Sequence, residues 1–169
     1  MSINKKKLFK PGFTLLELLV VIAILGILST IGIGSFMSSQ AKSRDARRKG
    51  DLQGVVAALE MFNNDKGKYP TSTLGVINGC AYDAGTKLYA SCPWGGEWKS
   101  GAVVYFPHLP VDPSGNSYYY ESDSDGSYYK LYALLENTKD KAASAAMYTG
   151  PKCTSSANSC NYMVKSTNK

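Results

Sequence analysis

The sequence is poor in the residues that build catalytic and metal centres. Its 169 residues include one histidine, His108, and four cysteines, none of them in a Cys-x-x-Cys pair. A zinc site needs closer ligand spacing and usually histidine support. Gly-x-Ser-x-Gly, His-Glu-x-x-His and phosphate-binding glycine loops are absent from the sequence as well. We therefore expect neither an enzyme nor a protein with a cofactor.

An excess of positive charge is missing from most of the chain, although the formal net charge is +6. Lys5, Lys6, Lys7 and Lys10 lie in an acid-free start, and a second basic cluster occupies residues 42–49. From Asp51 onward, ten lysines are balanced by eleven acidic residues. A nucleic-acid-binding domain carries its positive charge over one folded face. Nucleic acid is therefore not indicated as a partner.

What the chain does have is a long apolar run. Residues 13–36 read FTLLELLVVIAILGILSTIGIGSF and contain a single charge, Glu17. As a helix the run spans about 36 Å, enough to cross a hydrocarbon core of about 30 Å. The lysines before it favour a cytoplasmic N-terminus, although the basic cluster after it weakens that rule.

Three interpretations of this run compete. A secretory signal peptide is disfavoured, because the apolar core is too long and no small-x-small cleavage site follows. A plain signal anchor would leave Glu17 near the interface, where its side chain can snorkel to water. The third interpretation explains Gly12 and Glu17 as parts of one motif, described next.

The segment Gly12-Phe13-Thr14-Leu15-Leu16-Glu17 strongly resembles the processing site of type IV prepilins and pseudopilins. The resemblance implies that a membrane prepilin peptidase cleaves between Gly12 and Phe13 and methylates the new N-terminus at Phe13. It makes Glu17 the fifth mature residue, where the family carries a glutamate that is thought to pair with the N-terminus of a neighbouring subunit. That pairing would set the axial register of a filament.

The resemblance also implies the partners and the location. These are the peptidase, an inner-membrane assembly platform and further copies of the chain in a helical filament. The chain would lie in the cytoplasmic membrane with its head on the outer face, and afterwards in a cell-surface filament. One departure from the family is the stretch Thr30–Gly34, which has glycines where many major pilins have a helix-kinking proline.

The pattern past Ser38 predicts that the helix continues in amphipathic form. An apolar stripe recurs at helical spacing, at Leu52, Val55, Val56, Leu59 and Phe62. We expect the helix to end near Lys66, with Gly67 as its cap and Tyr69-Pro70 beyond it. Residues 41–50 are expected to form a solvated face; the alternative is a patch for lipid headgroups, DNA or acidic neighbours.

Short strands are predicted after the helix. Residues 71–100 look like a loop, and Val103–Phe106 is a strand candidate. Residues 117–122 and 127–135 are stronger candidates, joined by the turn Asp123–Gly126. Tyr129, Leu131, Ala133 and Leu135 share one face, which should pack on the helix stripe.

The predicted fold class is therefore α+β, a long N-terminal helix packed on a small antiparallel sheet. We divide the chain into a leader (1–12), a transmembrane and filament-core helix (13–40), an amphipathic half (41–67) and an antiparallel β head (68–169).

The four cysteines favour two disulfides formed in an oxidising compartment. Of three pairings, Cys80–Cys92 and Cys153–Cys160 are preferred, because each closes a short segment. Some major pseudopilins bind calcium after their last strands, so Asp123, Asp125 and Asp140 are weak candidates by resemblance. Calcium takes about six to eight oxygen ligands, and Asp123 and Asp125 fit a turn better.

The function that follows is that of a structural subunit of a type IV pilus-like filament. Two alternatives stay open at this point. One is a pseudopilin of a type II secretion or DNA-uptake machine, and the other is a membrane-anchored surface binding module.

Overall fold

The computed structural model describes residues 12–85, 88–156 and 159–167. The chain divides into two compact units between Ser39 and Gln40. The second unit holds the last part of the helix together with all nine strands of the described chain, and it is the head referred to below.

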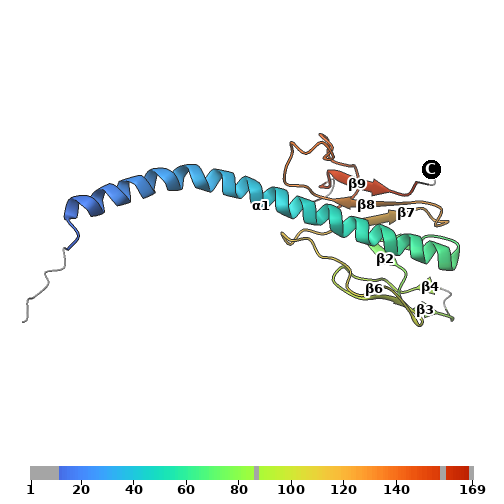
Figure 1. Ribbon diagram of the computed structural model, residues 1–169. Helices are drawn as coiled ribbons and strands as arrows, with labels where there is room; N and C mark the ends of the chain where they lie inside the picture. Colours follow the sequence, from blue (N-terminus) through green and yellow to red (C-terminus); the bar gives the residue numbers. More distant parts are fainter. Residues whose placement is uncertain (1–11, 86–87, 157–158, 168–169) are drawn as a thin grey trace, which may run out of the picture. The chain divides into compact units, whose positions relative to one another are not determined.

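One helix, α1, runs from Leu15 to Lys66 (Figure 1). It continues through Thr30–Gly34 because glycine, unlike proline, keeps its backbone donor. It ends as the sequence predicts: Gly67 adopts a left-handed φ of 73°, and its amide donates to the Asn63 carbonyl at 2.7 Å. Glycine is favoured in this position because it has no Cβ to clash.

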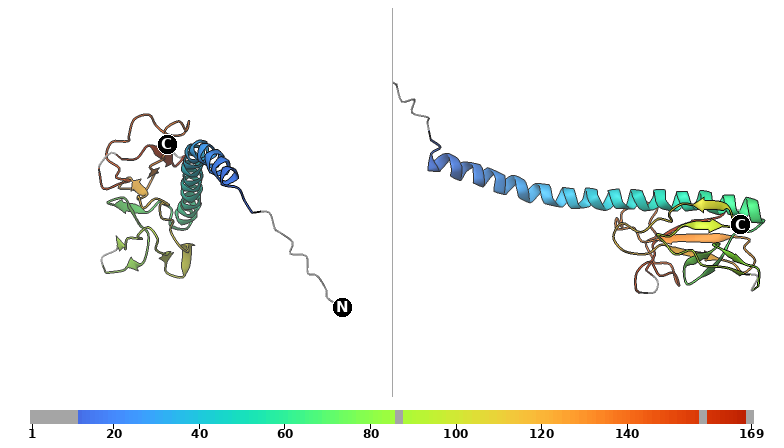
Figure 2. Two further views of the ribbon diagram at one scale, coloured as in Figure 1. Left: turned by 90° about the vertical axis from the view of Figure 1, so that its left-hand side faces the viewer. Right: turned by 90° about the horizontal axis from the view of Figure 1, so that it is seen from below.

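The strands form four small antiparallel sheets (Figure 2). Three are hairpins: β1 (Thr71–Thr73) with β2 (Val76–Asn78), β3 (Tyr82–Asp83) with β4 (Leu88–Tyr89), and β5 (Trp98–Ser100) with β6 (Val103–Phe106). The fourth has the order β7 (Tyr119–Ser122), β8 (Tyr129–Ala133), β9 (Tyr162–Lys165). The α+β class is therefore confirmed.

The predicted hairpin is present, but the sequence analysis missed other strands. β7 and β8 pair across the Asp123–Gly126 turn. Residues 71–100, expected as a loop, contain β1 to β5, and the C-terminal tail adds β9 beside β8. These strands are two to four residues long. Such short strands show little periodicity in the sequence. Their positions are set by pairing with neighbouring strands and by the Cys80–Cys92 disulfide.

The core forms between the helix stripe and the sheet. Leu52, Val55, Leu59 and Phe62 from α1 are fully or almost fully buried in one cluster with Tyr129, Leu131 and Ala133 of β8. Full burial of a large apolar side chain stabilises a fold by about 1.5–3 kcal/mol. The face predicted for β8 is thus the one that packs on α1.

The tyrosine hydroxyl groups of the head do not all point to water. Several donate instead to carboxylates on α1: Tyr118 to Asp51 at 2.7 Å, Tyr69 to Glu60 at 2.9 Å and Tyr105 to Asp65 at 3.0 Å. Burial, together with the Glu60 carboxylate, raises the pKa of Tyr69 to about 12. These bonds satisfy the polar ends of buried rings and link the last part of α1 to the rest of the head.

Candidate functional site

The predicted cleavage junction lies in an open segment before the helix. A Cβ built on Gly12 meets nothing within 4 Å, and Phe13 is exposed. Helix α1 begins two residues later, at Leu15. The leader lysines, at positions 5, 6, 7 and 10, lie outside the described residues.

Glu17 closes the N-terminus of α1 together with Thr14. The Thr14 amide and hydroxyl donate to Glu17 Oε2 at 3.0 and 2.8 Å, and the Glu17 amide donates to Thr14 Oγ1 at 3.2 Å. This reciprocal arrangement is a capping box. The signal was readable in the sequence as Thr14-x-x-Glu17, but the sequence analysis missed it.

The capping box leaves part of the Glu17 carboxylate available. Both of its accepted bonds end on Oε2, and within the described ranges no residue donates to Oε1. A buried carboxylate in lipid or protein is costly unless it is paired. The geometry therefore permits Glu17 to keep its helix cap and still accept a bond from another chain.

The side chains that follow Glu17 form an exposed apolar surface. Large apolar residues from Leu18 to Met37 are all exposed where the structure describes their side chains. By length and composition, this part of α1 is apolar enough to cross a membrane. The described part of this segment lies in the unit that ends at Ser39, so the head has its own core beyond it.

The basic cluster after the apolar run is not simply a solvated face, and that expectation is wrong for two residues. Arg48 is 0 % exposed and Asp45 is also buried. The Arg48 guanidinium donates to Asp112 Oδ2 at 2.6 Å, to Asp45 Oδ1 at 2.7 Å and to Glu136 Oε1 at 2.8 Å. Lys42 and Arg47 do remain exposed.

Glu136 joins this cluster from the segment after β8. It accepts bonds from Arg44 Nε at 2.8 Å and from Ser114 Oγ at 2.9 Å, in addition to Arg48. The bonds from Arg44 and Arg48 outweigh partial burial and lower the pKa of Glu136 to about 2. Burial lowers the pKa of Arg48, but its bonds to three carboxylates raise that pKa by more than burial lowers it. The net shift is upward, so Arg48 stays charged.

We call this set the ionic cluster; its members are Arg44, Asp45, Arg48, Asp112, Ser114 and Glu136. It connects α1 to two loops of the head. The sequence analysis missed it because the partners of Arg48 lie far along the chain. Only the Asp45–Arg48 pair, three residues apart on a helix, was a readable signal.

The three calcium candidates have other partners. Asp140 accepts a bond from Lys49 Nζ at 2.7 Å. Asp123 accepts the amide of Ser127 at 2.7 Å within the hairpin turn, where Ser124 also donates to Asp125 at 3.0 Å. No group of three or more His, Cys, Asp or Glu side chains able to hold a metal occurs in the part of the chain that the structure describes.

The cysteines form two disulfides. Cys80 bonds to Cys92 and Cys153 to Cys160, with Cα–Cα distances of 5.4 and 5.2 Å. The first closes the segment that contains the β3–β4 hairpin, and the second holds a loop before β9. Both short loops favoured from the sequence are thus closed in the structure.

Comparisons with known proteins agree with the N-terminal motif and extend over the head. The family model of the prokaryotic N-terminal methylation motif matches residues 10–33, and that of type II secretion system (T2SS) protein G matches residues 35–147. The matches together reach from Lys10 to Met147, with only Gly34 outside both.

Two individual relatives carry the description of the second family model, and a third is a pilin. The type II secretion system core protein G of Pseudomonas aeruginosa is 33% identical over 131 residues, which cover 78% of this chain and 87% of that protein. The Vibrio cholerae protein of the same name is 31% identical, with 77% and 83% covered. The type IV major pilin protein PilA of Myxococcus xanthus is 41% identical over 58 residues, covering 34% of this chain and 26% of that pilin. No solved structure matches the chain.

Proposed function

The chain belongs to the type II secretion system protein G family, and from this premise we propose that it is a structural subunit of a secretion pseudopilus. The observation that carries the proposal is the family match over residues 35–147, joined to the methylation motif at residues 10–33. A pilus-like filament was the first expectation from the sequence, with the pseudopilin as its alternative. The comparisons favour the alternative.

In this proposal the chain is processed and then polymerised, and it catalyses nothing. Residues 1–12 are the leader, removed by a prepilin peptidase that also methylates Phe13. Residues 13–40 hold the chain in the cytoplasmic membrane before assembly and form the filament core afterwards, while residues 41–67 carry the β head, 68–169, on the outer face. The paired cysteines suit that oxidising side of the membrane.

We assign Glu17 the role of setting the register between subunits. Its exposed carboxylate, with Oε1 free of described donors, suits an acceptor for the methylated amine of a neighbouring Phe13. In an apolar filament core such a pair neutralises two charges that would otherwise be costly to bury.

Intact mass measurement of the membrane-extracted protein tests the processing. We expect loss of residues 1–12 and gain of one methyl group. The variant Gly12→Val should keep its leader, because a branched side chain stands at the cleaved bond. An unprocessed N-terminus in the parent protein would instead support the membrane-anchored binding module.

The variant Glu17→Ala tests the register. We expect normal membrane insertion and normal leader removal, but at least a tenfold loss of sedimentable filament, with Thr14→Ser as the matched control that keeps the cap. Filaments of normal length and yield from Glu17→Ala would contradict the assignment.

A type IV pilus subunit is the second candidate, supported by the 41% identity to PilA over 58 residues. Electron microscopy of cells expressing the protein at its native level separates the two. A pseudopilin is expected to leave the surface bare while its loss abolishes protein secretion. Long surface filaments with unaffected secretion would favour the pilus.

A further inference from the structure

The three-stranded sheet of the head has one face that is only partly covered. The buried side chains of β8 described above pack on α1. Because successive side chains of a strand point to opposite faces, Lys130 and Tyr132 lie on the other face. There Tyr132 is buried in a second cluster with the Cys153–Cys160 disulfide. Lys130 is outside that cluster and partly exposed, so this end of the face is open.

Two lysines stand opposite each other on the open end of this face. Lys130 of β8 is the register partner of Lys165 of β9. The next residue, Ser166, donates its amide to the Tyr129 carbonyl at 3.1 Å. The lysine pair is therefore of the narrow, non-hydrogen-bonded kind, in which the side chains are closest. Like charges directly opposite each other destabilise a sheet, so this pair is unfavourable unless an anion lies beside both ammonium groups.

No carboxylate of the described residues forms an ion pair with either lysine. Glu121 of β7 is the register partner of Lys130 on its other side. Its Oε2 accepts a bond from the Tyr132 hydroxyl at 3.0 Å instead. The Lys130 ammonium lies 5.6 Å from the centroid of the Tyr128 ring. That contact is attractive but supplies no negative charge.

Both lysines line an open pocket of about 310 Å³, together with Tyr128 and Ser166. Ser166 is 3% exposed. Its Oγ accepts a bond from the Tyr129 amide at 3.4 Å, and its hydroxyl hydrogen has no acceptor among the residues that the structure describes. The pocket therefore offers two ammonium groups and one hydroxyl donor, and none of its lining residues is acidic.

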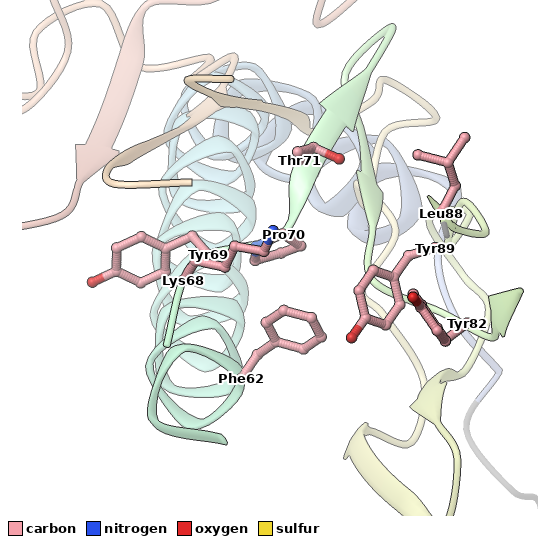
Figure 3. A pocket seen from close by; sticks show the side chains of 8 residues that line it. All are labelled: Phe62, Lys68, Tyr69, Pro70, Thr71, Tyr82, Leu88 and Tyr89. Carbon is pink, nitrogen blue, oxygen red and sulfur yellow. The ribbon is translucent and has the colours of Figure 1, made fainter. Parts of the chain in front are cut away.

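Another pocket of the head lacks this pattern of charge. It has a volume of about 320 Å³ and is lined by residues from the end of α1, from the segment that follows and from the β3–β4 hairpin (Figure 3). Lys68 is the one charged residue among the eight that line it, and four of the others carry aromatic rings. The paired positive charge is thus a property of the pocket on β8 and β9.

We propose that Lys130, Lys165 and Ser166 bind a phosphate group. Phosphate on an organic molecule carries about 1.5–2 negative charges at pH 7 and three acceptor oxygens, which match two ammonium groups and one hydroxyl. A carboxylate carries a single charge and would neutralise only one of the lysines. Free phosphate and a phosphate on a small organic molecule share this chemistry, and the pocket has the size of a small ligand site, about 300 Å³ or more.

Acetylation of lysines in the full-length chain, held in an uncharged detergent, tests the site. The probes are inorganic phosphate and phenyl phosphate, each compared with chloride at equal ionic strength, and mass spectrometry follows every lysine. Acetylation requires the neutral amine, and a nearby negative charge favours the ammonium form. We therefore expect phenyl phosphate to slow the acetylation of Lys130 and Lys165 about tenfold. Lys99 and Lys152, which are exposed elsewhere on the head, should react as before.

The two probes identify the source of the phosphate. Equal protection by inorganic phosphate would assign the site to free phosphate, and protection by phenyl phosphate alone would assign it to an organic phosphate. Equal slowing at Lys99, Lys130, Lys152 and Lys165, or no slowing at any of them, would overturn the proposal.

The variant Lys165→Gln provides a second measurement. A ligand that binds only the folded chain raises the thermal unfolding midpoint. We expect the protecting probe to raise the midpoint of the parent chain and of the matched control Lys99→Gln, but not that of Lys165→Gln. A Lys165→Gln chain that responds like the parent would overturn the proposal. Neither measurement requires an assembled filament, so failure here would leave the proposed function intact.

Discussion

Arg48 illustrates how one residue joins the last part of α1 to the loops of the head. Its side chain is completely buried among three carboxylates, from α1, from the loop before β7 and from the segment after β8. Burying an ion pair gains little overall, because desolvation offsets the attraction. Removing one partner is nevertheless severe, because the remaining charges stay buried and unpaired.

We therefore predict that Arg48→Met lowers the free energy of unfolding by about 3–5 kcal/mol. The matched control is Arg47→Met, one residue earlier, where the side chain is 61% exposed and lies 3.9 Å from Asp51. That change should cost no more than about 0.5 kcal/mol. Near-ultraviolet circular dichroism of detergent-extracted protein in urea measures both, and equal losses would contradict the role of Arg48.

Glu136 gives the ionic cluster a predictable dependence on pH. Its pKa falls from 4.5 to about 2 on folding, so it stabilises the head fully above about pH 4.5. That contribution is lost as the pH falls from about 4.5 through 2, because the carboxylate then takes up a proton. Since the side chain is 28% exposed, we expect a contribution of roughly 1–2 kcal/mol after solvent screening.

The variant Glu136→Gln should therefore be less stable at pH 7 and should lose less stability between pH 4.5 and 2. Urea unfolding midpoints across this interval measure the difference. Glu97→Gln, at an exposed position, serves as the control. Parallel pH profiles for the parent and Glu136→Gln would refute the assignment.

At the level of elements, the β7–β8 turn also fixes the segment that leaves α1. The Tyr69 amide donates to the Gly126 carbonyl at 2.8 Å. Gly126 has a φ of 69°, and a Cβ there would overlap the Tyr69 carbonyl oxygen. The turn Asp123–Gly126 thus has a structural role, because its glycine lets the turn backbone approach the backbone of Tyr69 closely.

Two glycines with similar backbone conformations allow a matched test. Gly115 has a φ of 78°, and a Cβ there meets nothing within 4 Å. We expect Gly115→Ala to cost about 1 kcal/mol, the strain of the left-handed conformation alone. Gly126→Ala should cost at least about 2 kcal/mol more, since backbone must also move. Similar thermal unfolding midpoints for the two variants would show that the close approach is unimportant.

At the level of the whole chain, the head has its own core, and no described side chain before Ser39 belongs to it. The division falls between Ser39 and Gln40. The ionic cluster begins at Arg44, and the core stripe begins at Leu52.

A chain that begins at Gln40 is therefore expected to fold alone, with a thermal midpoint within a few degrees of the full-length protein. A chain that begins at Gly50 lacks Arg44, Asp45 and Arg48, which leaves Asp112 and Glu136 without their cations. It should lose at least about 3 kcal/mol. Circular dichroism of both fragments measures this, and equal stability would mean that the cluster does not support the head.

The sequence by itself determined the features that depend on neighbouring residues. These are the processing motif from Gly12 to Glu17, the apolar run, the glycine end of α1 and the β7–β8 hairpin. Periodicity, caps and tight turns are set by a few consecutive residues, so their patterns are readable in one chain.

Only the tertiary structure decided the features that join distant residues. Strand β9 gains its place by pairing with β8, and Arg48 is buried only because Asp112 and Glu136 approach it from other loops. Lys130 and Lys165 are ordinary lysines in the sequence, and their pairing appears only in the fold. Such contacts close long loops, and the entropy lost on closing them is offset only by the assembled core. No pattern among neighbouring residues therefore predicts these contacts.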